Sequence, residues 1–261
     1  MTIVCLHDKA EIAAFLGRNP ALNIYALGDL DDFFWFATTW YGLRHAGELQ
    51  QVALVYAGPE LPIVLAFDAD HAAATAELLR GISYLLPRRV YAHLSKHAVQ
   101  ALCNDYQIYS HGAYLKLELT EYAALRVVDA TGVVQLGVRD LVAIEALYRA
   151  SYPGNWFDPR MLETGCYFGV WQDGALVSIA GIHVYSPAYR VAALGNITTH
   201  PAHRGRGLAR KTTAALCQYL TPQIAHIGLN VRRENRSAIA CYESLGFTRI
   251  ATYGEWMLTG R

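Results

Sequence analysis

The sequence predicts an α/β protein (α+β, with a mixed sheet) in which a central twisted sheet is flanked by helices. Short runs rich in Val, Ile and Leu are bounded by Gly, Pro or Asp and alternate with Ala-rich helical runs. With 261 residues, 53% of them hydrophobic, the chain is long enough for two domains. We therefore expect one domain at 1–122, a second at 132–261, and a linker near 121–132.

The first half alternates strands and helices. Its runs of branched apolar residues predict buried strands, and its Ala-rich runs predict helices. The expected strands are 2–6, 52–56, 62–67, 89–94 and 114–119. The expected helices are 9–16, 20–27, 70–79 and 95–103.

The second half is expected to follow the order β-α-β-β-β-α-β-α-β-β. Asp140 precedes the apolar stripe of Ile144 and Leu147, which predicts a helix capped by this aspartate. The pair Asp173-Gly174 predicts a tight hairpin. The expected strands are 133–137, 167–171, 175–184, 191–199, 226–231, 247–253 and 255–258, and the expected helices are 140–150, 207–220 and 235–245.

The whole-chain composition argues against several classes of protein. Lys and Arg (22) balance Asp and Glu (22), so charge indicates no nucleic-acid partner. No apolar run approaches the roughly 18 residues of a membrane span, and residues 1–16 carry charges where a secretory signal has an apolar core. Five cysteines without CxxC spacing fit reduced, mostly buried thiols. We expect a cytoplasmic protein without a membrane partner.

The most informative segment is 196–209, where a β-branched strand stops at Pro201 and a glycine-rich turn opens a helix. Gly205 and Gly207 lack a Cβ, so the backbone can approach a phosphate closely. The first N–H groups of the helix have no intrahelical partner and carry the positive end of the helix dipole. Four basic residues surround this turn: Arg204, Arg206, Arg210 and Lys211. The turn predicts a pyrophosphate site, with an ordinary loop bearing solvated arginines as the alternative.

Two nucleotide motifs fit this turn poorly. A P-loop requires Gly-Lys followed by Ser or Thr, whereas Leu208-Ala209 follow the glycines here. A dinucleotide fingerprint requires a third small residue where this chain has Arg210.

The segment Arg204-x-x-Gly207-x-Ala209 after a strand resembles the Arg/Gln-x-x-Gly-x-Gly/Ala motif of the GNAT superfamily of N-acetyltransferases. Downstream, Leu229-Asn-Val231, Asn235, Ala238, Tyr242 and Leu245-Gly246-Phe247 resemble the elements that close the family's cofactor site. The resemblance spans roughly 133–258. The segment Asn23-x-x-x-Leu27-Gly-Asp-Leu30 resembles the N-terminal part of two-domain members, so the first domain is expected to be a degenerate GNAT-like copy.

The resemblance implies that acetyl-CoA or another short acyl-CoA is the cosubstrate. Strand 197–199 should offer backbone groups to the pantetheine arm and splay from strand 226–231, leaving a slot for the thioester. The residues expected to bind the coenzyme are Ile197, Thr198, Thr199, Arg204, Gly205, Arg206, Gly207, Leu208, Ala209 and Asn235.

Tyr242 is the expected catalytic residue. It lies seven positions after Asn235, so the two share one helical face. By the resemblance, Tyr242 protonates the departing thiolate, a role open to a phenol with an ordinary pKa of about 10. The alternative is a core aromatic residue beside Phe247.

The residue that deprotonates the amine is left open. The strand segment 194–197 has no acid where many family members have a glutamate. The candidates are His183, His200, Asp158 and Glu163, the last two in an expected loop at 155–165 that would cover the acceptor. Each has an alternative as a surface or capping group.

The sequence thus predicts an acetyl-CoA-dependent N-acetyltransferase that acts on an amine of a small molecule or peptide by direct attack in a ternary complex. The alternative is a non-catalytic acyl-CoA-binding or regulatory module. No metal is expected, since His93 and His97 have no third ligand in the sequence pattern. The cluster Arg232-Arg233-x-x-Arg236 fits the coenzyme's phosphates better than a nucleic acid.

Overall fold

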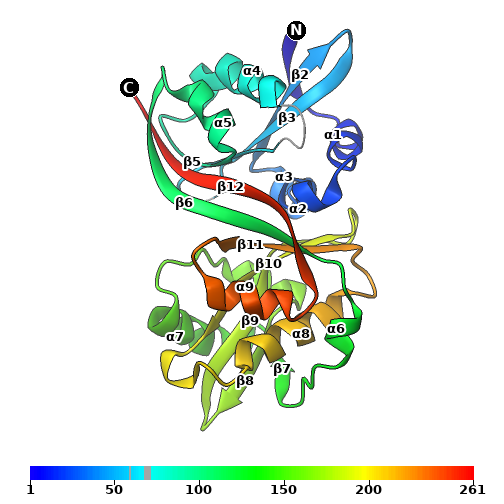
Figure 1. Cartoon of the computed structure of the whole chain (residues 1–261), viewed down its shortest axis with the longest axis vertical. Coiled ribbons are helices and arrows are strands. Elements are labelled where there is room, and N and C mark those ends of the chain that lie inside the picture. Colours follow the sequence, from blue (N-terminus) through cyan, green and yellow to red (C-terminus); the bar gives the residue numbers. More distant parts are fainter. Residues whose placement is uncertain (59, 68–71) are drawn as a thin grey trace. The chain divides into compact units, whose positions relative to one another are not determined.

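The computed structural model describes residues 1–58, 60–67 and 72–261, which divide into two compact units (Figure 1). Unit 1 contains Met1–Lys116, Arg232–Glu234 and Ile250–Arg261. Unit 2 contains Leu117–Val231 and Asn235–Arg249. Each unit therefore includes residues from both halves of the sequence.

The first two helices of unit 1 are capped by side chains at their N-termini. Asp8 accepts a hydrogen bond from the Ala10 N–H at 2.8 Å, and Asn19 caps the next helix ahead of Pro20. The elements are β1 (Thr2–Leu6), α1 (Lys9–Leu16), α2 (Pro20–Gly28), α3 (Asp32–Trp35), β2 (Thr38–His45), β3 (Glu48–Tyr56), β4 (Ile63–Ala66), α4 (Ala72–Ile82), η1 (Ser83–Leu85), β5 (Arg89–Leu94), α5 (Lys96–Val99), η2 (Gln100–Leu102) and the start of β6 (Tyr106–Leu119).

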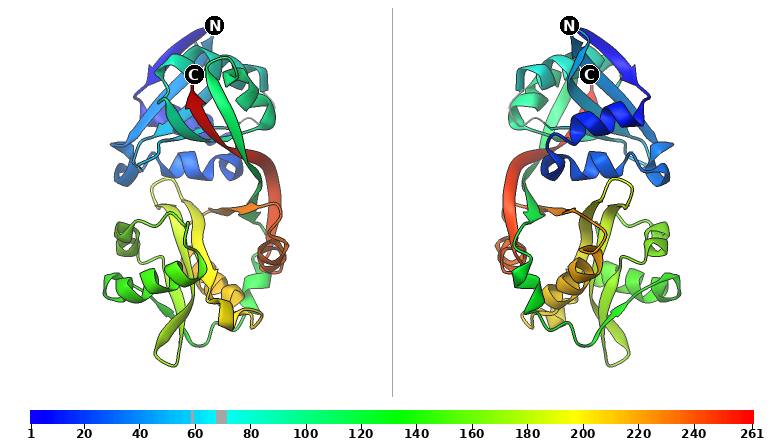
Figure 2. Two further views of the ribbon diagram at one scale, coloured as in Figure 1. Left: turned by 90° about the vertical axis from the view of Figure 1, so that its left-hand side faces the viewer. Right: turned by 90° about the vertical axis from the view of Figure 1, so that its right-hand side faces the viewer.

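Unit 2 continues the alternation of strands and helices. Its elements are α6 (Ala123–Arg126), β7 (Val133–Gln135), η3 (Val138–Asp140), α7 (Leu141–Ser151), η4 (Pro159–Thr164), β8 (Phe168–Gln172), β9 (Ala175–Ser186), β10 (Val191–Thr199), η5 (Pro201–His203), α8 (Leu208–Leu220), β11 (His226–Arg232), α9 (Arg236–Glu243) and β12 (Phe247–Gly260). Helices α7 and α8 contact opposite sides of β9 and β10 (Figure 2). None of the described helices has the length and hydropathy needed to cross a bilayer.

The two units repeat one strand topology. In unit 1, β1 to β4 pair antiparallel in succession and β4 then pairs parallel with β5. In unit 2, β7 to β10 pair antiparallel in succession and β10 pairs parallel with β11. In both, a helix (α4 or α8) connects the two parallel strands, as a parallel crossover requires. The mixed sheets expected from the sequence are confirmed, and the first half is a second copy of the same fold.

The two long strands β6 and β12 have exchanged places: β12 lies beside β5 of the first copy, and β6 lies beside β11 of the second. On the side of β5 away from β4, the hydrogen-bonded strand is β12, from the C-terminal part of the chain, with register from Gly254↔Leu94 to Thr259↔Arg89. The strand next to β11 is β6, from the middle of the chain. Each copy is therefore completed by a strand from the other half of the sequence. The expected division into domains at 1–122 and 132–261 stays a prediction.

Several expected elements differ from the observed ones. Strand β2 and helix α3 were not expected, and the helix at 95–103 is divided into α5 and η2. The two C-terminal strands are a single strand, β12, and the linker region 121–132 contains α6. The helix expected at 70–79 begins at residues outside the described ones, and α4 is observed from Ala72.

Asp140 is the N-cap residue of α7, as expected, but its side chain makes no capping hydrogen bond to this helix. This residue ends the short helix η3, and its carboxylate accepts a hydrogen bond from the upstream Gly137 N–H at 2.9 Å instead of from α7. The hairpin prediction is confirmed, because Asp173 and Gly174 have φ of 49° and 77°.

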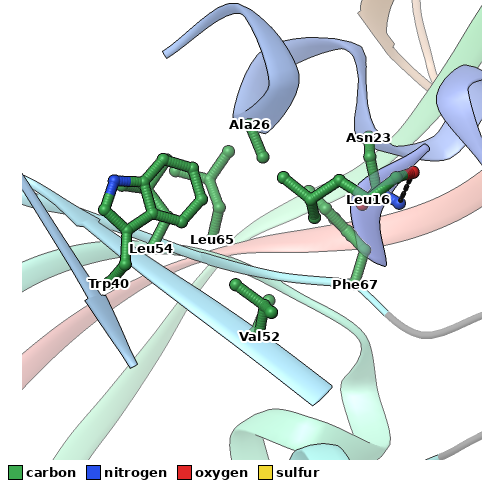
Figure 3. A pocket seen from close by; sticks show the side chains of 9 residues that line it. Leu16, Asn23, Ala26, Trp40, Val52, Leu54, Leu65 and Phe67 are labelled. Carbon is green, nitrogen blue, oxygen red and sulfur yellow. Dashed lines mark hydrogen bonds between the residues drawn. The ribbon is translucent and has the colours of Figure 1, made fainter. Parts of the chain in front are cut away.

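Unit 1 encloses buried polar groups and a small cavity. Lys116 is 3% exposed, and its Nζ lies 3.9 Å from the centre of the Phe67 ring. Glu255 accepts hydrogen bonds from Tyr91 Oη at 2.6 Å and Tyr253 Oη at 3.0 Å. A cavity of about 10 Å³, which has room for roughly one water molecule, is lined mainly by apolar side chains (Figure 3). At its edge Asn23 Nδ2 donates to the Leu16 carbonyl at 3.2 Å.

Asp29, at the end of α2, makes the stability of the protein depend on pH. It is 6% exposed, and burial raises its pKa from 3.8 to about 8. Between these values the native state holds a proton that the unfolded state has lost, so stability falls as pH rises, by up to about 1.4 kcal/mol per pH unit. We predict that Asp29→Asn flattens this decline in melting temperature between pH 5 and pH 8. The exposed Asp105 supplies the control, and a variant with the wild-type slope would contradict the prediction.

Candidate functional site

Strands β10 and β11 part within unit 2. Their parallel pairing runs from Val191↔His226 to Leu194↔Leu229, whereas β10 continues to Thr199. The final residues of β10 thus leave the register with β11. This is the splay expected from the sequence, at the strand predicted to receive the pantetheine arm.

A bulge at Asn196 accompanies the separation. Asn196 has φ of 55°, a left-handed conformation that asparagine tolerates better than most residues, and the pairing of β10 with β9 shifts between Gly195 and Thr198. Tyr148 Oη of α7 donates to its carbonyl at 3.1 Å. Its side chain is bonded at 3.1 Å to Tyr167 Oη and to Asn155 Nδ2. These bonds fix the bulge and therefore the direction in which β10 leaves β11.

The glycine-rich turn after β10 forms an open cradle at the start of α8. Gly205 and Gly207 have φ of 76° and 73°, and Gly207 is the N-cap residue. A Cβ built on either glycine meets no atom within 4 Å. Arg204 Nε donates to the Thr199 carbonyl at 3.2 Å and so ties the turn to the end of β10. The space around both glycines is therefore open beside the first turn of α8, where an anion is expected from the sequence.

The basic residues near the cradle have different surroundings. Arg206 is exposed, Arg210 Nε donates to Ser244 Oγ at 3.2 Å, and Lys211 lies 3.7 Å from Asp129. The cradle residue Leu208 is buried against Val170 and Val177, so its side chain anchors α8 to the sheet. Leu208 can therefore offer only its backbone to a ligand.

Tyr242 lies on α9 with 9% of its surface exposed, and its ring centre is 6.0 Å from that of Phe247. Burial raises the pKa of its phenol, and the nearby Tyr152 at the end of α7 adds to the rise. The phenol therefore stays protonated at neutral pH. Packing against Phe247, the expected alternative role, is present and is compatible with proton donation.

Asn235 is the N-cap residue of α9. Its Oδ1 accepts hydrogen bonds from the Ala238 N–H at 3.2 Å and from Ser237 Oγ at 3.1 Å. The carbonyl of this side chain thus serves the helix, and a contact with the coenzyme stays a prediction for its amide group.

The four candidate bases have distinct surroundings. Asp158 caps η4 and accepts hydrogen bonds from Arg160, which lower its pKa. His200 accepts from the Ala202 N–H at 3.3 Å, and Glu163 is exposed. The ring of His183, on β9, lies over Gly195, where an added Cβ would be 2.0 Å from its Cδ2. His183 thus adjoins the point where β10 and β11 part.

The cysteines are less uniformly buried than expected. Cys166 and Cys217 are buried, Cys241 is half-buried, and Cys5 and Cys103 are exposed. Burial raises the pKa of Cys166 to about 11, which makes its thiol unreactive. Within the described ranges, no group of three or more His, Cys, Asp or Glu side chains is arranged to hold a metal ion.

Sequence reasoning missed two polar residues of the site. Asn196 was noted only as part of a strand without an acid, although a Gly-Asn pair inside an apolar strand is a signal for a bulge. Asn230 follows Leu229, the last residue of β11 that pairs with β10, and its Oδ1 is buried without a hydrogen-bond partner among the described residues. A lone asparagine in a strand carries no sequence signal for this arrangement.

Comparison with known sequences agrees with this geometry. Residues 140–247 match the model of the Acetyltransferase (GNAT) family. An uncharacterized protein of Mycobacterium leprae is 36% identical over 104 residues, 38% of this chain and 28% of that protein. The N-alpha-acetyltransferase RimI of Mycobacterium tuberculosis is 33% identical over 88 residues, 32% of this chain and 52% of that protein. The chain thus spans only part of the length of both relatives.

Solved structures share the fold at low identity. A GNAT-family protein from Novosphingobium aromaticivorans is similar over 80% of this chain and 88% of its own, with a TM-score of 0.59 and 23% identity. A tandem GNAT protein from the clavulanic acid biosynthesis pathway covers 98% of this chain and 97% of its own, with a TM-score of 0.60 and 16% identity. A Drosophila protein reaches a TM-score of 0.72 at 13% identity, over 98% of both chains. The family match identifies residues 140–247 as a GNAT acetyltransferase domain, and the solved structures share the fold of the chain that contains it.

Proposed function

We propose that unit 2 is an N-acetyltransferase that transfers an acetyl or short acyl group from coenzyme A to a primary amine in a ternary complex. The observation that carries the proposal is the separation of β10 from β11 immediately before the glycine cradle of α8. A phosphate chain at the cradle and a thioester between the parted strands account for both features. The proposed function extends the family assignment to a reaction and a set of residues.

The proposed coenzyme site is built mainly from backbone. Gly205, Gly207 and the first turn of α8 would hold the pyrophosphate, where the open space at both glycines leaves room for the anion. The end of β10, at 197–199, would hydrogen-bond the pantetheine arm as an added strand does. Arg204 and Arg206 would supply charge around the phosphates.

The proposed reaction is a direct acyl transfer. The lone pair of the neutral amine attacks the thioester carbonyl carbon, the new C–N bond forms, and the C–S bond breaks. Tyr242 donates its proton to the leaving sulfur and regains one from solvent, while the surplus proton on the amine nitrogen passes to water. The raised pKa keeps the phenol protonated but weakens it as an acid, so Tyr242 must hydrogen-bond the sulfur as its charge develops.

The first test removes the phenol proton. We predict that Tyr242→Phe lowers kcat by about 100-fold or more, the range typical of a lost general acid, and leaves the Kd of acetyl-CoA unchanged in calorimetry. Tyr219→Phe, at a phenol 39% exposed on α8, is the matched control. Equal turnover by the two variants would remove Tyr242 from the mechanism.

The second test fills the cradle. We predict that Gly207→Ala weakens acetyl-CoA binding at least tenfold, because its Cβ enters the space proposed for phosphate and the left-handed φ of 73° is strained by about 1–2 kcal/mol. Gly174→Ala, in the β8–β9 hairpin, has a similar φ of 77° and the same open surroundings. It should lose similar thermal stability with no loss of binding.

If both glycine variants bind acetyl-CoA as tightly as the wild type, the cradle does not hold the coenzyme. Wild-type protein that binds acetyl-CoA tightly but acetylates no member of a broad amine panel would instead assign the alternative function, an acyl-CoA-binding regulatory module. That outcome is favoured by the lack of an acid at 194–197, where a catalytic glutamate is often found in this family.

A further inference from the structure

We propose that Asn230 is the residue that positions the acceptor amine, and that the acceptor is a primary amine carrying an aromatic group. This inference rests on the proposed acyl transfer and specifies its second substrate. It follows from a buried unpaired oxygen on one side of the parted strands and an aromatic wall on the other.

Asn230 stands at the edge of the slot. Leu194 of β10 and Leu229 of β11 form the last pair between these two strands. Their buried side chains share one face of the sheet. Successive residues of a strand alternate between the two faces of the sheet. The Asn230 side chain therefore points to the face opposite Leu229, and a side chain at position 195 would point to that same face. On that face Gly195 is covered by the His183 ring. Asn230 and His183 therefore flank the start of the slot.

The carboxamide oxygen of Asn230 is a buried hydrogen-bond acceptor that lacks a donor within the described part of the chain. Its Oδ1 is buried, and none of the described residues donates a hydrogen bond to it. A buried acceptor without a donor destabilises a protein, and most such groups in native structures are paired. The neighbouring buried Asn196 shows the usual pattern, with bonds at 3.1 Å to both Tyr167 and Asn155. A ligand N–H at Asn230 would supply the missing donor.

The opposite wall is aromatic. The Trp156 ring lies 5.9 Å from that of His183, tilted by 39°, and Trp156 is 37% exposed. Tyr152, 44% exposed, precedes it in the same loop and lies near Tyr242. An aromatic group of the acceptor can therefore pack against exposed rings within reach of the proposed acid.

The carboxylate that lies two residues after Trp156 is already engaged by a neighbouring cation. Asp158 accepts hydrogen bonds from the Arg160 backbone N–H and guanidinium at 2.5–3.2 Å, so it offers little charge to a polycationic acceptor. A neutral primary amine has two N–H donors and one lone pair. If one N–H is donated to Asn230 Oδ1, the lone pair stays free to attack the carbonyl carbon. An amide oxygen also cannot take up the proton of the amine, so Asn230 orients the nucleophile without acting as a base.

The decisive experiment measures whether Asn230→Ala changes the KM for the amine without lowering the melting temperature of the protein. At saturating acetyl-CoA, Asn230→Ala should raise the KM for 2-phenylethylamine at least tenfold, while the Kd of acetyl-CoA stays unchanged and the melting temperature is equal or higher. A merely structural asparagine would lower the melting temperature on removal. Asn104→Ala, at an exposed asparagine of unit 1, is the matched control and should match the wild type in all three measurements.

A second variant tests the acceptor class. Trp156→Ala should remove the preference of kcat/KM for 2-phenylethylamine over ethylamine and over spermidine, with the Kd of acetyl-CoA unchanged. Wild-type turnover that favours spermidine, or an Asn230→Ala variant with an unchanged KM for the amine, would overturn this inference and leave the proposed acyl transfer standing. A wild-type protein that acetylates no amine would overturn both.

Discussion

The separation of β10 from β11 is the constraint on which the site depends. A parallel pair that continued past Leu194↔Leu229 would close the sheet and leave no room for a thioester. The left-handed Asn196 turns the end of β10 away, and three side chains, Tyr148, Tyr167 and Asn155, hold it there. These groups are buried or half-buried and fully engaged, so the gap is prepared by the protein before any ligand arrives.

The two copies of the fold have diverged at the same place. Both connect their parallel strands through a helix, α4 in unit 1 and α8 in unit 2. The connection into α8 contains Gly205 and Gly207, whereas residues 67–71, which lead into α4, contain no glycine and no arginine. In unit 1 the described interior holds aromatic rings around Lys116 and a cavity of about 10 Å³. The first copy has kept the strand order of the fold without the residues that make an anion cradle.

Local chemistry was readable from the sequence, and long-range pairing was not. The first and last residues of three elements were predicted correctly: strands 2–6 and 191–199 and helix 9–16. Capping residues and runs of β-branched residues act over only a few positions, so they mark such boundaries in the sequence. The cradle followed from its glycines. Asp140 was placed correctly at the start of α7, but the bond of its carboxylate to the upstream Gly137 N–H was not foreseen. The sequence contains no signal for the exchange of β6 and β12 or for the unpaired side-chain oxygen of Asn230. Both depend on which distant segments come together in three dimensions.

The exchanged strands also bear on the order in which the chain can be completed as it is synthesised. Domains usually fold as units, the N-terminal one first, while the remainder is still being translated. Here β5 of unit 1 is hydrogen-bonded to β12, whose pairing residues lie between Gly254 and Thr259. The sheet of the first half is therefore closed only after residues 254–259 have been synthesised, and the nascent chain carries an open strand edge at β5 until then.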